Sequence, residues 1–221
     1  MRKLCLAVLF MSLMFSCSQQ NESNKPQLGD LIKNQCFISD YLVPSTLKMV
    51  RAMDGYILEM TGDSYHTWCG EEYEFAEEIN YLSELYGDTS YDGYNRPGKH
   101  IALAYPIDDI TIYCDKNFDA KHPAGKPLDD VVKLNYQSYY NFIQNGYHPY
   151  TQNEQHLQDV DSYSLCFDCI NADLTKLVSL NYPYNVIAFT SSPETPGEYN
   201  FTIEMTTNGK TLKTTFTHTF E

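Results

Sequence analysis

The sequence GEYNFTIEMTTNGKTLKTTFTHTF, residues 197–220, decides the fold class of the chain. In its first half, large apolar side chains alternate with polar ones, which is the two-residue period of a half-buried β-strand. The pair Asn208-Gly209 then supplies the preferred residues of a tight type I′ turn. If these two residues form the loop, Thr207 faces Lys210 and the segment is a β-hairpin.

The register of this hairpin follows from its apolar residues. It places Met205 opposite Leu212 and Phe201 opposite Phe216, so the large apolar side chains share one face. A slip of one residue would turn them to opposite faces. A hairpin with one apolar face needs a second sheet to cover it. The sequence therefore predicts a β-sandwich of the immunoglobulin-like kind that ends in this hairpin. Residues 196–197 are expected to form the turn that leads into the hairpin.

Shorter patterns predict further elements in the rest of the chain. Residues 71–86 carry one apolar stripe at helical spacing and acidic residues in the first turns, with Gly87 as the expected left-handed cap. Residues 128–146 follow a loose helical period and predict one or two short helices. We therefore expect an α+β, mainly β fold, with one or more helices in the N-terminal half. Further strands are predicted at 55–61, 101–105, 109–114, 174–180 and 186–190, and irregular connections at 88–99, 116–127 and 148–164.

Charge and composition exclude several classes of protein. The chain has 15 basic and 29 acidic residues and a net charge of −14. Proteins that bind nucleic acid need a positive surface to displace counterions from phosphate, so we expect no nucleic-acid partner. A mean hydropathy of −0.42 excludes a multi-pass membrane protein, whereas a hydrophobic fraction of 43% suffices for a buried core.

The N-terminus has the pattern of a bacterial export signal. Two basic residues precede an apolar run over residues 4–15, which is too short to span a bilayer. The string LMFSC at 13–17 resembles a lipobox, in which the cysteine, here Cys17, receives a diacylglycerol lipid. The alternative is an ordinary secretory peptide cut near Ser16, which would leave Cys17 without lipid.

These features predict the organisation of the whole chain. We expect a signal peptide at 1–16, a flexible tether at 17–29 and a single globular body at 30–221, with a possible sub-boundary near 148–164. The tether is polar and holds a proline, as flexible linkers do. Lipid on Cys17 would anchor the protein in the cell envelope, at the outer membrane, with the body facing the periplasm or the cell surface.

The cysteines leave several pairings open. Of the seven in the chain, Cys5 leaves with the signal peptide and Cys17 is the lipidation site. Export permits disulfides, and the remaining odd number leaves at least one thiol over. The C-x-x-C motif at 166–169 suits a redox pair or half of a zinc site, but the negative charge of Asp168 between the two thiols disfavours a reactive thiolate, and no second pair completes a zinc site. Structural disulfides and buried thiols both remain open for Cys36, Cys69, Cys114, Cys166 and Cys169.

The remaining polar residues match no catalytic motif. The sequence lacks the metalloprotease, nucleophile-elbow, P-loop and dinucleotide-binding patterns. The acid pairs at 108–109 and 129–130 suit glycosidase carboxylates or calcium ligands, but a solvated acidic loop is the alternative, since strand neighbours point to opposite faces. His218, predicted opposite Tyr199, is expected to pack or to face solvent. We expect no enzymatic activity, no metal and no cofactor.

The chain is unusually rich in tyrosine, with 19 residues. Exposed together, tyrosines offer flat apolar faces with hydrogen-bonding tips, which suit sugar rings or a protein partner. The alternative is that tyrosine is favoured on half-buried β surfaces. The residues predicted to form such a ligand platform are Tyr136, Tyr139, Tyr140 and Tyr147.

The stretches DITIYCDKNFDAKHPAG at 109–125 and LDDV at 128–131 resemble a recurring segment of uncharacterised Bacteroidales-type lipoproteins. The closing hairpin with its Asn-Gly-Lys turn is similar as well. The resemblance implies a lipid-tethered protein of the periplasm or outer membrane with an immunoglobulin-like C-terminal half, and it carries over no catalytic residue.

Together these features predict a lipid-anchored cell-envelope protein that serves in non-catalytic binding or assembly, with a protein or glycan as its ligand. One alternative is a glycan-binding module of a polysaccharide-uptake system. Another is a hydrolase whose two carboxylates come from distant segments.

Overall fold

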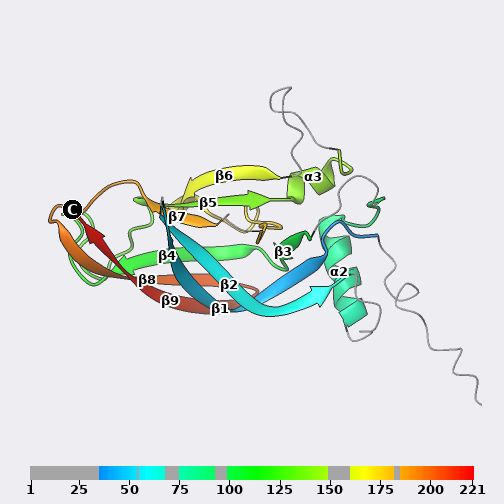
Figure 1. Cartoon of the computed structure of the whole chain (residues 1–221), viewed down its shortest axis with the longest axis horizontal. Coiled ribbons are helices and arrows are strands. Elements are labelled where there is room, and N and C mark those ends of the chain that lie inside the picture. Colours follow the sequence, from blue (N-terminus) through cyan, green and yellow to red (C-terminus); the bar gives the residue numbers. More distant parts are fainter. Residues whose placement is uncertain (1–34, 54, 68–74, 93–98, 149–159, 182–184) are drawn as a thin grey trace, which may run out of the picture.

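The computed structural model describes residues 35–53, 55–67, 75–92, 99–148, 160–181 and 185–221. These residues form a mainly β protein with two sheets and two short helices, which confirms the fold class at this level. The molecule is elongated, with the helices at one end and the C-terminus at the other (Figure 1). The expected signal peptide, the tether and Cys17 lie outside the described residues.

The smaller sheet has three strands in the order β4-β8-β9 and contains the C-terminal hairpin. The predicted register is confirmed: Thr207 pairs with Lys210, and Phe201 pairs with Phe216. Asn208 and Gly209 have φ angles of 48° and 67°, and a type I′ turn requires both to be positive. The strands are β4 (Ile107–Cys114), β8 (Gly197–Thr207) and β9 (Lys210–Phe220).

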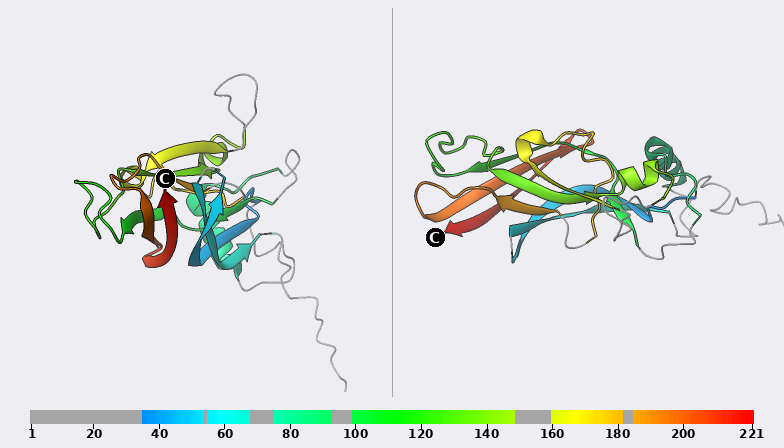
Figure 2. Two further views of the ribbon diagram at one scale, coloured as in Figure 1. Left: turned by 60° about the vertical axis from the view of Figure 1, so that its left-hand side comes forward. Right: turned by 90° about the horizontal axis from the view of Figure 1, so that it is seen from above.

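The larger sheet has six strands in the order β3-β1-β2-β7-β5-β6 and curls into a half-barrel. Its pairs are antiparallel except for β1 and β3, which run parallel. The two views in Figure 2 show it curling around the smaller sheet, and β1 packs against β9. The strands are β1 (Asp40–Ala52), β2 (Gly55–His66), β3 (Ile101–Leu103), β5 (Val132–Ser138), β6 (Asp161–Cys166) and β7 (Val186–Phe189).

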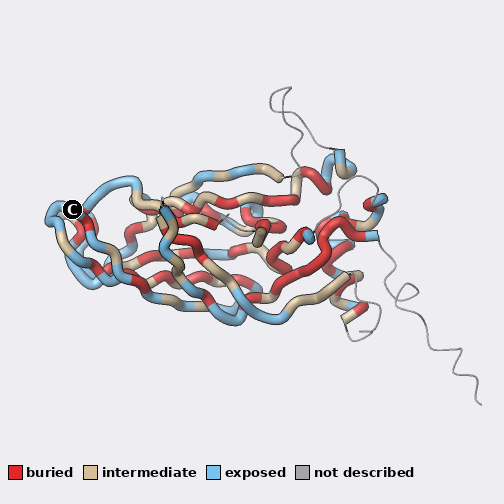
Figure 3. The backbone as a smooth tube through the Cα atoms, in the orientation of Figure 1, coloured by how far each residue is buried: buried red, intermediate tan, exposed pale blue. Residues whose placement is uncertain are grey.

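Two apolar clusters form the core, and buried residues follow the inner faces of both sheets (Figure 3). The first cluster lies between the sheets and includes Phe201 and Ile112 from the smaller sheet and Leu134 and Ile187 from the larger one. The second lies at the helical end and is rich in aromatic residues. Its buried aromatic members are Phe37, Tyr41, Tyr86, Tyr91, Tyr139 and Phe142.

Helix α2 (Ala76–Tyr86) confirms the helix predicted from the apolar stripe, although residues 71–74 lie outside the described residues. Ile79, Leu82 and Tyr86 are buried on one face, and Gly87 ends the helix with a φ of 70°. The strands predicted at 55–61, 101–105, 109–114 and 186–190 are also confirmed, with ends shifted by a few residues.

The prediction of only helices at 128–146 is wrong. Residues 132–138 form strand β5, and only the short helix α3 (Tyr140–Gln144) follows it. Val132, Leu134 and Tyr136 are buried and alternate with half-buried Lys133 and Asn135. The pairing of this strand with both β6 and β7 decided its conformation over the looser helical spacing.

The strand predicted at 174–180 is also wrong. These residues form turns with isolated bridges at Val178 and Ser179, and Leu177 has a φ of 49°, which interrupts an extended backbone. The connection predicted at 148–164 contains the start of β6, which pairs with β5. A 3₁₀ turn, η3 (Phe167–Cys169), follows β6. Strand β1 was not predicted.

Candidate functional site

Residues of both sheets line an open cleft of about 370 Å³. The strand ends that carry these residues lie toward the end of the molecule opposite the helices (Figure 1). It is formed by the start of β2, the end of β7 with the segment that follows, and the end of β9. Small-molecule sites typically have volumes of roughly 300–1,000 Å³, so this cleft fits one small ligand or one ring of a larger one. Its main side chains are Tyr56, Phe189, Ser192, His218 and Phe220.

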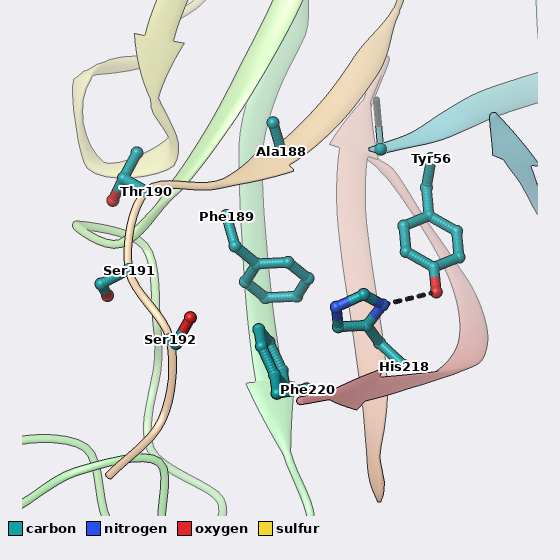
Figure 4. A pocket seen from close by; sticks show the side chains of 9 residues that line it. Tyr56, Ala188, Phe189, Thr190, Ser191, Ser192, His218 and Phe220 are labelled. Atoms are coloured by element: carbon teal, nitrogen blue, oxygen red, sulfur yellow. Dashed lines mark hydrogen bonds between the residues drawn. The ribbon is translucent and has the colours of Figure 1, made fainter. Parts of the chain in front are cut away.

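Aromatic rings form the floor of the cleft (Figure 4). The imidazole of His218 stacks on Phe189, with ring centroids 5.5 Å apart and planes inclined by 19°. The ring of Phe220 meets the imidazole edge-on at 4.3 Å. His218 and Phe220 lie two residues apart on β9, so the strand period places both on the same face. The rings fix the orientation of the imidazole and offer apolar surface to a ligand.

Tyr56 holds the imidazole from the other side. Its hydroxyl lies 3.0 Å from Nδ1 of His218 and donates to the carbonyl of Thr217 at 3.1 Å. Burial lowers the pKa of His218, and the positive charge of Arg51 acts in the same direction. Burial likewise raises the pKa of Tyr56. Both groups are therefore neutral at neutral pH.

Gly55 allows the close approach of β2 and β7 at the edge of the cleft. Its φ is 149°, and a Cβ at this position would lie 2.4 Å from the carbonyl oxygen of Ile187. Only glycine fits there without moving the backbone of β7.

A segment of three hydroxyl-bearing residues lines the opposite side of the cleft. Thr190, Ser191 and Ser192 follow β7 and are exposed. In Figure 4 the hydroxyl of Ser192 is turned toward the rings of Phe189 and Phe220, whereas Thr190 and Ser191 lie on the far side of the segment. The cleft therefore combines apolar ring faces with hydrogen-bonding groups, a lining that is typical of small-molecule sites.

The structure does not bring the four tyrosines of the predicted platform into one exposed surface. Tyr136 is buried and donates to the carbonyl of Leu174 at 2.6 Å. Tyr139 is also buried, and its hydroxyl accepts from the side-chain amide of Asn181 at 2.7 Å. Tyr140 and Tyr147 are half-buried at the helical end, where Lys176 lies over the ring of Tyr140 and Tyr147 bonds to Asp88.

Asp88 is the centre of a second polar cluster, at the helical end. It is fully buried and accepts hydrogen bonds from the amides of Phe37 and Ile38 at 2.7 and 2.9 Å. The hydroxyls of Tyr41 and Tyr147 add bonds of 3.2 and 3.1 Å. Burial raises the pKa of Asp88, and these donors oppose the shift. The cluster ties three distant segments together.

Four of the five cysteines of the body lie in the described residues and form no disulfide there; Cys69 lies outside them. Burial raises the pKa of Cys36 to about 12, and it raises the pKa of Cys114 as well. The carboxylate of Asp168 raises the pKa of Cys169. Thiols with raised pKa values are poor nucleophiles at neutral pH. The pairing of the cysteines stays a prediction.

The acidic pair at 129–130 does not converge on one site. Asp129 accepts from the backbone amide of Ile112 at 2.9 Å, whereas Asp130 lies 2.8 Å from Nε2 of His122. The other ring nitrogen of His122 lies 2.8 Å from Asp119, and this contact is the main reason that the pKa of His122 is raised. Among the described residues, no group of three or more potential metal ligands gathers.

Sequence reasoning missed the cleft because its parts come from three separate strands. The sequence placed His218 on the apolar face of β9, between Phe216 and Phe220, and this alternation was the available signal. It gave no indication that Tyr56 and Phe189 would meet the imidazole there.

No protein-family model, curated protein or solved structure matches the chain. Within the described ranges, no helix has the length and apolar character needed to cross a membrane. The assignment of a function therefore depends on the geometry of the cleft and on the pattern of the N-terminus.

Proposed function

We propose that the protein is a lipid-anchored, non-catalytic binding protein of the cell envelope, and that the cleft at His218 is its ligand site. The observation that carries this proposal is the lining of the cleft, in which the ring of Phe189 and the hydroxyl of Ser192 face the same space. Such a surface suits reversible binding of a small polar molecule with an apolar face.

The same lining favours a saccharide as the ligand class. A sugar ring has apolar C–H faces and a rim of hydroxyl groups, which match aromatic rings and hydrogen-bonding side chains respectively. The glycan-binding module of a polysaccharide-uptake system is therefore the specific form of the proposal that we favour. The aromatic surface that supports it is the cleft, because Tyr136 and Tyr139 are buried.

A glycan array followed by calorimetry tests this ligand class. We expect the chain from Cys17 onward to bind one class of neutral glycan, and Phe189→Ala to weaken that binding at least tenfold. Tyr81→Ala is the matched control, because Tyr81 is an aromatic side chain 57% exposed on α2, far from the cleft. Loss of binding in Tyr140→Ala instead would assign the ligand to the tyrosines of the helical end. Silence across the array would contradict glycan binding.

The envelope location is proposed from the lipobox-like string at 13–17. Two or more acyl chains on one residue suffice for durable membrane anchoring. We expect radiolabelled palmitate to enter the wild-type protein, and Cys17→Ala to move the protein from the membrane to the soluble fraction. Incorporation of no label into the wild type would contradict the anchor.

The immunoglobulin-like character of the fold also stays a proposal. The hairpin covered by a second sheet supports it, whereas the parallel pairing of β1 with β3 adds a feature that an immunoglobulin sandwich does not need. A strand-by-strand superposition of the two sheets on immunoglobulin domains tests the point.

A further inference from the structure

We infer that His218 is a specificity-determining residue of the cleft: Tyr56 fixes it in one tautomer, so that its second ring nitrogen accepts a hydrogen bond from a ligand hydroxyl. This inference rests on the proposed function, because it assigns a role to one side chain of the same ligand site.

The tautomer follows from counting protons. The hydroxyl of Tyr56 has one proton and lies within hydrogen-bond distance of two groups, the Thr217 carbonyl at 3.1 Å and Nδ1 of His218 at 3.0 Å. A carbonyl oxygen can only accept, so the proton of Tyr56 goes to Thr217. Both contacts are then hydrogen bonds only if Nδ1 carries a hydrogen and donates it to the hydroxyl oxygen. A neutral imidazole has a single N–H, so Nε2 carries a lone pair.

The position of Nε2 makes this lone pair available to a ligand. Figure 4 shows the second nitrogen on the side of the imidazole away from Tyr56, toward Phe189 and the cleft. No hydrogen bond to Nε2 is found within the part of the chain that the structure describes. The stacked ring of Phe189 and the edge-on ring of Phe220 keep the imidazole in this orientation.

The surroundings of His218 keep it neutral. Arg51 on β1 is the charged group that acts on the imidazole, and Tyr56 on β2 is a titratable group in contact with it. From β7 and from β9 itself the imidazole meets the apolar rings of Phe189 and Phe220. Burial and Arg51 both lower its pKa, so Nε2 remains an acceptor at neutral pH.

Protonation converts this acceptor into a donor and adds a positive charge to a site that a ligand further desolvates. A ligand hydroxyl that donates to Nε2 stabilises the neutral imidazole, so binding lowers the pKa of His218 further. By linkage, affinity is then full above the pKa of His218 in the free protein and falls as the pH drops below it, by up to about tenfold per pH unit.

The first experiment measures the tautomer without any ligand. Long-range ¹H–¹⁵N NMR spectra of the mature chain at pH 7.5 distinguish the two nitrogens of His218 by their chemical shifts. We expect Nδ1 to carry the hydrogen, and Tyr56→Phe to abolish this preference. A wild-type His218 with its hydrogen on Nε2 would overturn the inference.

The second experiment measures the affinity for the best glycan of the array at pH 7.5 and at a pH one unit below the pKa of His218, which an NMR titration of the same protein measures first. We expect weaker binding at the lower pH in the wild type. In His218→Gln, which offers an acceptor that does not titrate, we expect binding independent of pH. His148→Gln is the matched control, because His148 is exposed at the helical end, and it should keep the wild-type pH profile.

The outcomes separate the two proposals. Glycan binding that is equal at both pH values in the wild type, or a pH profile that persists in His218→Gln, would overturn the role of His218 and leave the proposed function intact. No binding of any glycan at either pH would overturn the proposed function and this role together, even with the expected tautomer.

Discussion

Each end of the molecule contains an ionisable side chain held by tyrosine hydroxyls, but the two sites differ in how completely that side chain is satisfied. At the helical end, Asp88 is fully buried and accepts hydrogen bonds from two backbone amides and two tyrosines. At the opposite end, His218 is half-buried and contacts Tyr56 through one nitrogen only.

The difference indicates which of the two sites holds the structure together and which has capacity left for a ligand. A buried carboxylate surrounded by donors from separate segments stabilises their packing, and it leaves no group for a further partner. An imidazole that borders an open cleft keeps one hydrogen-bonding position. The aromatic surroundings are similar at both ends, so the number of aromatic residues does not identify a ligand site.

The largest expected effect comes from removing the ring below the cleft. Phe201 is fully buried between the sheets, stacks on Phe216 at 5.2 Å and contacts Phe189 at 4.9 Å. We expect Phe201→Ala to lower the free energy of unfolding by about 3–5 kcal/mol. Urea denaturation measures this change. The exposed Thr215→Ala on the neighbouring strand is the control, with a change within about 0.5 kcal/mol.

Phe201→Ala also tests whether the cleft at His218 and the cluster at Asp88 respond independently. We expect the NMR signals of His218 and Phe189 to shift, since the floor of the cleft loses its support, and those of residues around Asp88 to remain in place. Equal shifts at both ends would show that the two sites are one cooperative unit.

The next effect comes from the carboxylate at the helical end. Asp88→Ala leaves the buried amides of Phe37 and Ile38 without their acceptor, and we expect a loss of about 2–4 kcal/mol in the free energy of unfolding. Asp63→Ala, at an exposed position on β2, is the control. Glycan affinity of the folded Asp88→Ala protein should equal that of the wild type. A weaker affinity would mean that the helical end contributes to ligand binding.

The pH dependence of this loss has a defined sign. Because burial raises the pKa of Asp88 in the folded state, the stability linked to it is present below its unfolded pKa and decreases as the pH rises through the folded pKa. The difference in unfolding free energy between wild type and Asp88→Ala should therefore be larger at pH 4 than at pH 7. A larger difference at pH 7 would contradict the raised pKa.

The hairpin could be predicted residue by residue because the sequence signals that determine it lie within one short segment. The period of two, the Asn208-Gly209 turn and the shared apolar face together determine one register. The strand at 132–138 was missed because Val131 and Val132 fit either period, and the pairing of β5 with both β6 and β7 decides between them. Such pairing is not visible along the sequence.

The two polar sites were beyond sequence reasoning for the same reason. The bonds from Phe37 and Tyr147 to Asp88 span 51 and 59 residues, and that from Tyr56 to His218 spans 162. Tyr147 was identified as a candidate ligand residue from the local abundance of tyrosine, but its hydroxyl contacts Asp88. A tyrosine-rich segment predicts buried hydroxyl bonds and exposed platforms equally well, and only the fold distinguishes them.

The smallest expected effect comes from Tyr147→Phe, which removes one donor to Asp88 and keeps the ring. The hydroxyl also accepts from the backbone amide of Ser90 at 3.2 Å, so the loss of both hydrogen bonds should lower the free energy of unfolding by about 1–2 kcal/mol. Because the Tyr147 hydroxyl lowers the pKa of Asp88, its removal should raise that pKa further and shift the pH-dependent loss of stability to higher pH. Urea denaturation between pH 4 and 8 measures both changes.

Tyr140→Phe is the matched control for this prediction. Tyr140 is a half-buried neighbour in the same helical end, and its ring, rather than its hydroxyl, contacts Lys176. We expect its stability and pH profile to match those of the wild type. Tyr147→Phe could instead weaken glycan binding without changing the pH profile of unfolding. Tyr147 would then act on the ligand and not on Asp88, and the helical end would no longer be a purely structural site.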